Sequence, residues 1–166
     1  SAMSKETNKL IDLAKQVGVE NLVDPEYDAL ISTGEDVSSS LLAMALNSIE
    51  IRSRSWRGWQ LPIKTDNFHS NAKIEEIKTN QIINSFKEGA KVAVVSGFQG
   101  IEQAGRITTL GRGGSDTSAV AIAAAIDAER CDIYTDVSGI YTTDPRIKRN
   151  ASKLKKISFE EMLEMA

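Results

Sequence analysis

Apolar side chains recur at the spacing of a helix face in the N-terminal third of the chain. Between residues 10 and 17 they fall three and four positions apart, and Gly18 ends the pattern. A second helical pattern begins near Pro25, a residue that is tolerated in the first turn of a helix. It is interrupted by a Ser-Thr-Gly-Glu stretch at residues 32–35. We therefore expect two helices after Pro25, joined at this stretch.

Short apolar runs alternate with helical patterns in the rest of the chain. The run Lys-Val-Ala-Val-Val at residues 91–95 is typical of a buried parallel strand. The other strands are expected at residues 49–54, 72–77 and 131–135, and the other helices at residues 80–88, at residues 116–129 and from Ser158 onward. Strands that alternate with helices predict an α/β layer structure with a mostly parallel sheet.

The composition is that of a globular domain without a strong charge bias. The chain has 166 residues, of which 20 are basic and 23 acidic, and its net charge is −3. This balance excludes a strongly basic nucleic-acid binder, and no apolar run reaches the roughly 18 residues that a bilayer requires. We expect neither a nucleic acid nor a membrane as partner.

With one cysteine, Cys131, and one histidine, His69, neither an internal disulfide nor a zinc site is expected. A reducing, cytoplasmic location fits, with Cys131 as a core thiol and His69 as a surface residue.

A glycine-rich stretch, Gly-Arg-Gly-Gly-Ser-Asp at residues 111–116, precedes an Ala-rich and Ile-rich helical pattern. Its glycines permit backbone conformations and close approaches that side chains block. Ser115 or Asp116 can cap the following helix, whose free amides form an anion site. Arg112 can clamp a carboxylate or a phosphate. The spacing matches neither the P-loop nor the dinucleotide-binding fingerprint. Two interpretations stay open: a plain strand-to-helix turn, and a site for an anionic substrate.

Other polar residues are weaker candidates. Asp116 either caps the helix or organises cations around a phosphoryl group. Thr135 and Asp136 close a predicted strand at its C-terminal end, where open α/β sheets bind ligands. The polar connection that follows runs to residue 150, and this length favours a functional loop. Glu35, by its position alone, is expected to be a solvated helix residue.

Taken together, these motifs resemble one family, the aspartate kinases of the amino acid kinase superfamily. The most specific signal pairs Leu-Gly-Arg-Gly-Gly-Ser-Asp at residues 110–116 with Tyr-Thr-Asp-Val-Ser-Gly-Ile-Tyr-Thr-Thr-Asp-Pro-Arg at residues 134–146. The other matching stretches are residues 1–3, 32–35, 54–59, 65–66 with His69, 96–100 and 158–166. The resemblance implies a three-layer αβα sandwich with a mainly parallel central sheet, incomplete at both ends. It makes residues 1–166 one partial catalytic domain.

The resemblance also implies an activity. The family transfers the γ-phosphoryl group of ATP, with Mg²⁺ carried by the nucleotide, to the side-chain carboxylate of L-aspartate. The product, 4-phospho-L-aspartate, leads toward lysine, threonine and methionine. By resemblance, Glu35 contacts the substrate amino group and Arg112 holds its α-carboxylate. Gly114 and Ser115 line the aspartate and phosphate side, and Asp116 organises the catalytic lysines. The residues implied around the nucleotide are Thr135, Asp136, Tyr141, Asp144 and Arg146.

The chain departs from the family pattern at both ends. It contains no Lys-Phe-Gly-Gly-Thr-Ser motif, which supplies a catalytic lysine in the family, and it stops before the family's Gly-x-Lys segment and ACT domains. We therefore expect an internal fragment that is inactive alone, from a full-length protein that is a homo-oligomer. Two other interpretations stay open: a different amino acid kinase, acting on glutamate, acetylglutamate, carbamate or UMP, and a non-catalytic nucleotide-binding module.

Overall fold

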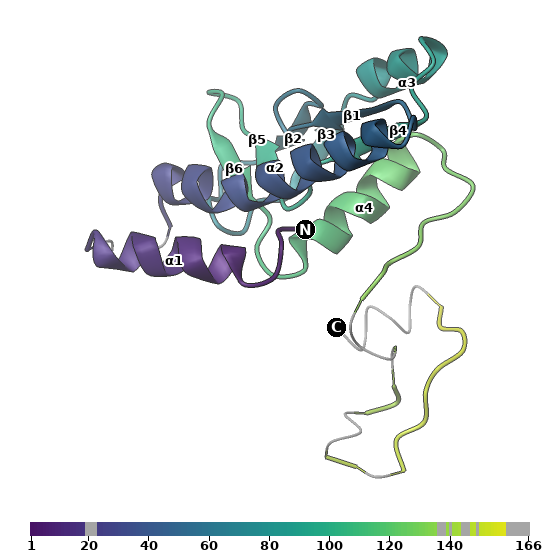
Figure 1. Cartoon of the computed structure of the whole chain (residues 1–166). Helices are drawn as coiled ribbons and strands as arrows, with labels where there is room; N and C mark the ends of the chain where they lie inside the picture. The colour runs from purple at the N-terminus through teal and green to yellow at the C-terminus, as the bar shows by residue number, and fades with distance from the viewer. Residues whose placement is uncertain (19–22, 136–138, 140, 144–146, 149, 159–166) are drawn as a thin grey trace. The chain divides into compact units, whose positions relative to one another are not determined.

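The computed structural model describes residues 1–18, 23–135, 139, 141–143, 147–148 and 150–158. Its contacts divide the chain into two compact units, Ser1–Asp132 and Ile133–Ala166. Every helix and strand of the described residues lies in the first unit (Figure 1). In chain order these are α1 (Glu6–Gln16), α2 (Pro25–Ser48), β1 (Ser53–Trp56), β2 (Ile63–Thr65), β3 (Ile74–Ile77), α3 (Asn80–Lys87), β4 (Val92–Val95), β5 (Gln99–Ile101), β6 (Ile107–Thr109) and α4 (Gly114–Ala125).

The strands of the first unit form two small sheets. One pairs β1 with β4 in parallel, with Ser53 opposite Val92 and Trp56 opposite Val95. The other has the order β3-β2-β5-β6, in which β2 runs parallel to β5. The pairs β2–β3 and β5–β6, which are neighbours in sequence, are antiparallel. Both pairings between strands far apart in sequence are therefore parallel, as the crossovers of an α/β fold require, and the predicted fold class is confirmed.

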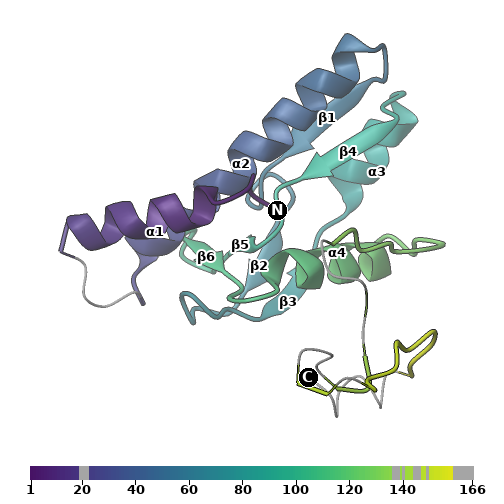
Figure 2. The same cartoon turned by 60° about the horizontal axis from the view of Figure 1, so that its bottom comes forward.

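Two apolar clusters hold the helices on this framework. The first joins α1 to α2 and consists of Leu10, Ala14, Tyr27 and Ile31. The second consists of Trp56, Leu61, Ile63 and Ile82, against which Ala93, Val95 and Ile122 pack, among others. Because Ile82 belongs to α3 and Ile122 to α4, both helices pack on the second cluster. The α2 helix contacts β1, β4 and β6 outside this cluster, so helices flank the strands on two sides (Figure 2).

The expectation of two helices after Pro25 is wrong, because α2 is continuous from Pro25 to Ser48. The hydroxyl groups of Ser32 and Thr33 donate to carbonyls three residues earlier in the same helix, so they do not compete with it. Gly34 is buried, and a Cβ there would lie 3.0 Å from Cβ of Ala2. This glycine therefore permits close packing of the N-terminal segment and does not end the helix.

Several strand predictions also need correction. The strand expected at residues 49–54 begins only at Ser53, and β2, β5 and β6, three residues each, were not predicted. The β4 residues are half-buried, because β4 has a single neighbour, β1, among the described strands. Residues 131–135 form no strand, since the two sheets of the described residues are built from β1 to β6 alone. Cys131 is consequently exposed and is not a core thiol.

The helix after the glycine-rich stretch begins earlier than predicted, at Gly114, and ends at Ala125. Its N-cap is Gly113, in the left-handed conformation with φ of 71°, and no side chain caps it. The expectation that Ser115 or Asp116 caps the helix is wrong, because both lie inside the first turn. The final helix expected from Ser158 falls on residues 159–166, outside the described residues. No helix in the described part of the chain is long and apolar enough to cross a membrane.

Candidate active site

A pocket of about 410 Å³ opens in the first unit where the N-terminal segment, α2 and the start of α4 meet. Four predicted site residues line it, namely Glu35, Gly114, Ser115 and Asp116. The rest of its lining comes from residues 1–5, Thr7, Asn8, Phe98, Gly111 and Gly113. The structure therefore brings together a helix carboxylate and the glycine-rich stretch, which stand far apart in the sequence.

Glu35 is a buried carboxylate, with only 4% of the residue exposed, and is not the solvated residue expected from its position in the sequence. The backbone N–H of Ala2 donates to its Oε1 over 3.0 Å. Its Oε2 is buried and has no hydrogen-bond partner among the described residues. Burial raises the pKa of this carboxyl, and the hydrogen bond from Ala2 offsets only part of the effect. A buried carboxylate oxygen without a donor is costly, so Glu35 is equipped to accept a cationic donor from a ligand.

The helical repeat explains how α2 presents this carboxylate. Asp28, Ser32, Glu35 and Ser39 stand at positions i, i+4, i+7 and i+11, which fall on one face of a helix. All four are buried. Asp28 and Ser39 have hydrogen-bond partners outside α2. The hydroxyl of Thr109 donates to Oδ1 of Asp28, and the Ser39 hydroxyl lies 2.9 Å from that of Ser96. Glu35 alone on this face leaves an oxygen unmatched, and it is the residue of this face that lines the pocket.

Gln99, which was not predicted as a site residue, holds α2 beside the strands. Its side-chain amide group donates to the carbonyl of Ser32 over 3.2 Å and to Oδ1 of Asp36 over 3.1 Å. Its Oε1 accepts from the backbone N–H of Gly58. These bonds bracket Glu35 on the helix, so Gln99 fixes the segment that carries the carboxylate.

The opposite wall of the pocket is the glycine-rich stretch. Gly111 and Gly113 take φ values of 73° and 71°, in the left-handed region that favours glycine. Gly114 is buried so closely that a Cβ would lie 2.9 Å from Cβ of Leu110 and from Cδ2 of Phe98. The first residues of α4, Gly114 to Asp116, line the pocket, and the first N–H groups of an α-helix have no partners within the helix. This wall suits an anionic group.

Of the three polar candidates in the glycine-rich stretch, two line the pocket and one does not. Ser115 is half-buried and lines the pocket, whereas Arg112 is exposed and does not line it. Asp116 lines the pocket and is exposed. Ser115 and Asp116 therefore share the pocket with Glu35, and the binding roles of Ser115, Asp116 and Arg112 stay predictions.

The predicted nucleotide residues fall in the second unit. Thr135 and Tyr141 are described, and Tyr141 forms an isolated antiparallel bridge with Lys153. The other three, Asp136, Asp144 and Arg146, lie outside the described residues. The predicted strand that was to present Thr135 is absent from the described residues, so its role in nucleotide binding stays a prediction. The described residues hold no cluster of three or more His, Cys, Asp or Glu side chains that suits a metal ion.

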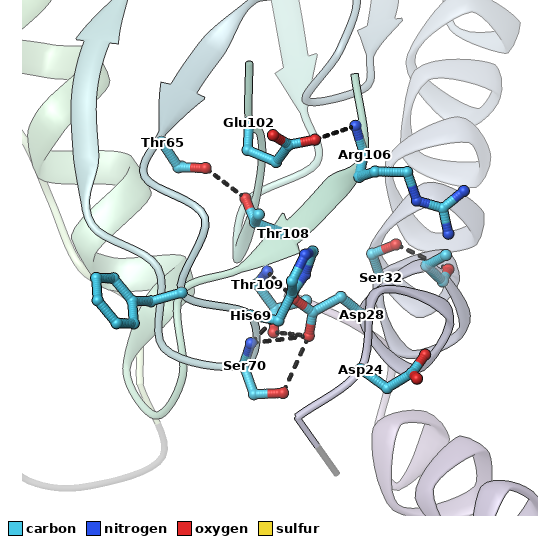
Figure 3. A network of polar contacts seen from close by, with 12 residues as sticks. Asp24, Asp28, Ser32, Thr65, His69, Ser70, Glu102, Arg106, Thr108 and Thr109 are labelled. Carbon is cyan, nitrogen blue, oxygen red and sulfur yellow. Dashed lines mark hydrogen bonds and ion pairs between the residues drawn. The ribbon is translucent and has the colours of Figure 1, made fainter. Parts of the chain in front are cut away.

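His69 is placed differently from the surface position expected for it. Its side chain is only 13% exposed, and Nδ1 lies 2.9 Å from Oδ2 of Asp28. Asp28 itself is fully buried (Figure 3).

Comparisons with known proteins agree with this geometry. The model of the amino acid kinase family matches residues 1–166. An aspartokinase from Bacillus sp. (strain MGA3) is 55% identical over the whole chain, which covers 40% of that protein. Among solved structures, E. coli aspartokinase III in complex with aspartate and ADP superposes with a TM-score of 0.78 at 35% identity, over 96% of this chain and 36% of the other.

A second solved structure, aspartate kinase from Synechocystis, gives a TM-score of 0.77 at 45% identity, over 99% of this chain and 27% of the other. The chain spans about 40% of the length of the curated relatives it matches. The family match extends over every residue, and the pocket lies between the segments that carry the family motifs. The chain belongs to the amino acid kinase family.

Proposed function

We propose that this chain is part of an aspartate kinase. The full-length protein, meaning the product of the complete open reading frame, transfers the γ-phosphoryl group of ATP to the side-chain carboxylate of L-aspartate. A bond forms between a carboxylate oxygen and the γ-phosphorus, and the bond from that phosphorus to the β–γ bridging oxygen breaks. The products are 4-phospho-L-aspartate and ADP. The high identity to aspartokinases over the whole chain supports this assignment.

The observation that carries the proposal is the unmatched Oε2 of Glu35 in a pocket shared with the start of α4. Aspartate presents one ammonium and two carboxylates. Glu35 accepts hydrogen bonds from the ammonium, which supplies the missing donor and the opposite charge. The amides of Ser115 and Asp116, in the first turn of α4, face anionic oxygens. Arg112, in the turn that precedes α4, grips the α-carboxylate with two parallel hydrogen bonds.

The transfer itself asks for positioning and charge neutralisation more than for covalent chemistry. Gly114 lets the start of α4 pack closely on Leu110 and Phe98, because a Cβ there would lie 2.9 Å from a side-chain carbon of each. Asp116 orients the cationic groups around the phosphoryl oxygens. Mg²⁺ carried by the nucleotide would neutralise phosphate charge. Thr135, Asp136, Tyr141, Asp144 and Arg146 contact the nucleotide.

The proposal includes a setting for this activity. We place the full-length protein in the cytoplasm, as a homo-oligomer, at the first step toward lysine, threonine and methionine. Residues 1–166 form part of its catalytic domain, and the chain by itself is inactive because it contains no Lys-Phe-Gly-Gly-Thr-Ser motif.

An acceptor panel on the full-length protein tests the proposal. ADP release is measured with L-aspartate, L-glutamate, N-acetyl-L-glutamate, carbamate and UMP, and hydroxylamine trapping of the acyl phosphate is measured with every acceptor except UMP. We expect turnover with L-aspartate on the order of 1 s⁻¹ or more and none with the others. Preference for any other acceptor would overturn the proposal. Turnover of L-aspartate by the isolated 166-residue chain would contradict its expected inactivity.

A further inference from the structure

Asp28 accepts hydrogen bonds from three residues of two other segments. Its Oδ2 accepts from Nδ1 of His69 over 2.9 Å, from the backbone N–H of Ser70 over 2.9 Å and from that of Thr109 over 3.0 Å. Its Oδ1 accepts from the hydroxyl groups of Ser70 and Thr109 over 3.2 and 2.7 Å. Figure 3 shows the carboxylate between these groups. Every donor comes from outside α2, so this fully buried side chain ties the helix to both segments.

Both segments support the glycine-rich turn that forms one wall of the pocket. Thr109 precedes Gly111 by two residues, and its carbonyl accepts from the N–H of Ala72. Gly111 rests on the other segment, where a Cβ added to it would lie 3.0 Å from Oδ1 of Asn71 and 3.2 Å from the carbonyl oxygen of Ser70. Asp28 therefore holds the turn from its entry strand and from the loop beneath it.

The same helix carries the carboxylate on the other wall. Glu35 follows Asp28 by seven residues, or two helical turns, which is roughly 10 Å along the axis. A rigid helix thus links the group that holds the turn to the group that accepts the ligand's cation. A shift of about 1 Å in such a site is enough to cost a large part of its activity.

We propose that Asp28 is a positioning residue of the aspartate site, whose carboxylate fixes the glycine-rich turn relative to Glu35. This inference rests on the proposed function for its effect on aspartate. A second expectation does not depend on the ligand. When the Asp28 carboxylate is changed, the backbone amides of residues 109–114 should exchange their hydrogens with solvent faster.

The carboxylate is essential to this arrangement because its two oxygens only accept. In Asp28→Asn one oxygen becomes an NH₂ group, which would face the N–H groups of Ser70 and Thr109 at the Oδ2 position and the N–H group of Ser70 at the Oδ1 position. A matched control is Glu26→Gln, which makes the same chemical change on the same helix. The side chain of Glu26 is 79% exposed and forms an ion pair with Arg106 at the surface.

The experiment measures hydrogen exchange and steady-state kinetics on the full-length protein. In Asp28→Asn we expect exchange in the peptide covering residues 109–114 to rise about tenfold, with the peptide over β4 unchanged. We expect the KM for aspartate to rise about tenfold, with the KM for ATP within about twofold, and Glu26→Gln to match the wild type in all three readouts.

Unchanged exchange at residues 109–114, or an equal rise over β4, would overturn the positioning role. If the wild-type protein does not phosphorylate aspartate, the proposed function fails, while the exchange data still decide whether Asp28 holds the turn. Should Asp28→Asn not fold, Thr109→Val removes one donor to Oδ1 and keeps the backbone bond to Oδ2. We expect Thr109→Val to raise exchange at residues 109–114 and the KM for aspartate by smaller factors than Asp28→Asn. Exchange like that of the wild type would count against the inference.

Discussion

The backbone N–H of Ala2 lies 3.0 Å from Oε1 of Glu35 and donates a hydrogen bond to it. This bond engages one carboxylate oxygen and leaves the other, Oε2, buried without a donor among the described residues. Glu35 is therefore held in place by the fold but only half-satisfied by it. A bound cationic group supplies the hydrogen-bond donor that Oε2 lacks in the free protein. The buried carboxylate therefore lowers the stability of the free protein and raises its affinity for the ligand.

Glu35→Gln is expected to stabilise the fold at pH 7.5. Burial raises the pKa of Glu35 above its usual value of 4.5. A carboxyl with a raised native pKa favours the native state below its unfolded pKa, and this contribution is lost as pH rises through the native pKa. Removing the buried charge should raise the free energy of unfolding by about 1 kcal/mol.

Thermal unfolding of the ligand-free protein at several pH values checks this prediction. The advantage of Glu35→Gln should shrink as pH falls toward 4, where the native carboxyl is protonated as well. A variant less stable than the wild type at pH 7.5 would show that the carboxylate is fully satisfied within the protein.

Gly111→Ala is expected to damage the site more than Gly105→Ala. Both glycines have left-handed backbones, with φ values of 73° and 82°, so each substitution costs about 1–2 kcal/mol of strain. A Cβ at Gly105 meets nothing within 4 Å, whereas one at Gly111 meets Ser70 and Asn71. Melting temperatures and the KM for aspartate in the full-length protein report the two effects. Equal rises in KM for the two variants would mean that the contacts beneath Gly111 do not shape the site.

Local sequence signals fix the ends of some helices, whereas several strands depend on contacts between segments far apart in the chain. The ends of α1 and α3 follow from local patterning and from Gly18 and Gly89, both at positive φ. Strands β2, β5 and β6 are three residues each, too short to show an alternating pattern, and they exist through pairing across the sheet.

Some residues of the site likewise stand out in the sequence, and others are recognised only in the tertiary structure. The glycine-rich stretch stands out in the sequence itself, whereas Glu35 becomes a candidate only through the family resemblance, since its position alone predicts a solvated helix residue. Asp28 and Gln99 could not be predicted, since polar residues in a helix or short strand usually face solvent. Their partners come from segments more than 40 residues away, such as Thr109 for Asp28. Only the tertiary structure shows that they are buried.

Asp116→Asn is expected to lower kcat far more than either KM. Asp116 lies within the first turn of α4 and does not cap it, so its exposed carboxylate is available to orient cations around the phosphoryl group. That interaction strengthens as charge rearranges in the transition state. The change in stability should stay within about 1 kcal/mol, the usual size of a charge effect at a helix N-terminus. Near-normal kcat in the full-length protein would contradict the assignment.

Arg112→Ala is expected to raise the KM for aspartate at least about thirtyfold, while the KM for ATP changes far less. Losing a desolvated, hydrogen-bonded charge pair typically costs roughly 2–5 kcal/mol, and the low end of that range is about thirtyfold. Arg112→Lys should be a poor substitute, because a lysine cannot form two parallel hydrogen bonds to one carboxylate. A rise in the KM for ATP that spares aspartate would make Arg112 a phosphate clamp instead.

Calorimetric binding of L-aspartate and succinate to the full-length protein tests the role of Glu35 most directly. Succinate carries both carboxylates of aspartate and has no ammonium. The wild type should bind aspartate at least about thirtyfold more tightly than succinate, since only aspartate supplies a donor to the buried Oε2. In Glu35→Gln this ratio should fall to about one, through loss of aspartate affinity, with succinate affinity preserved. If Glu35→Gln kept the wild-type preference for aspartate, Glu35 would not be the residue that recognises the substrate ammonium.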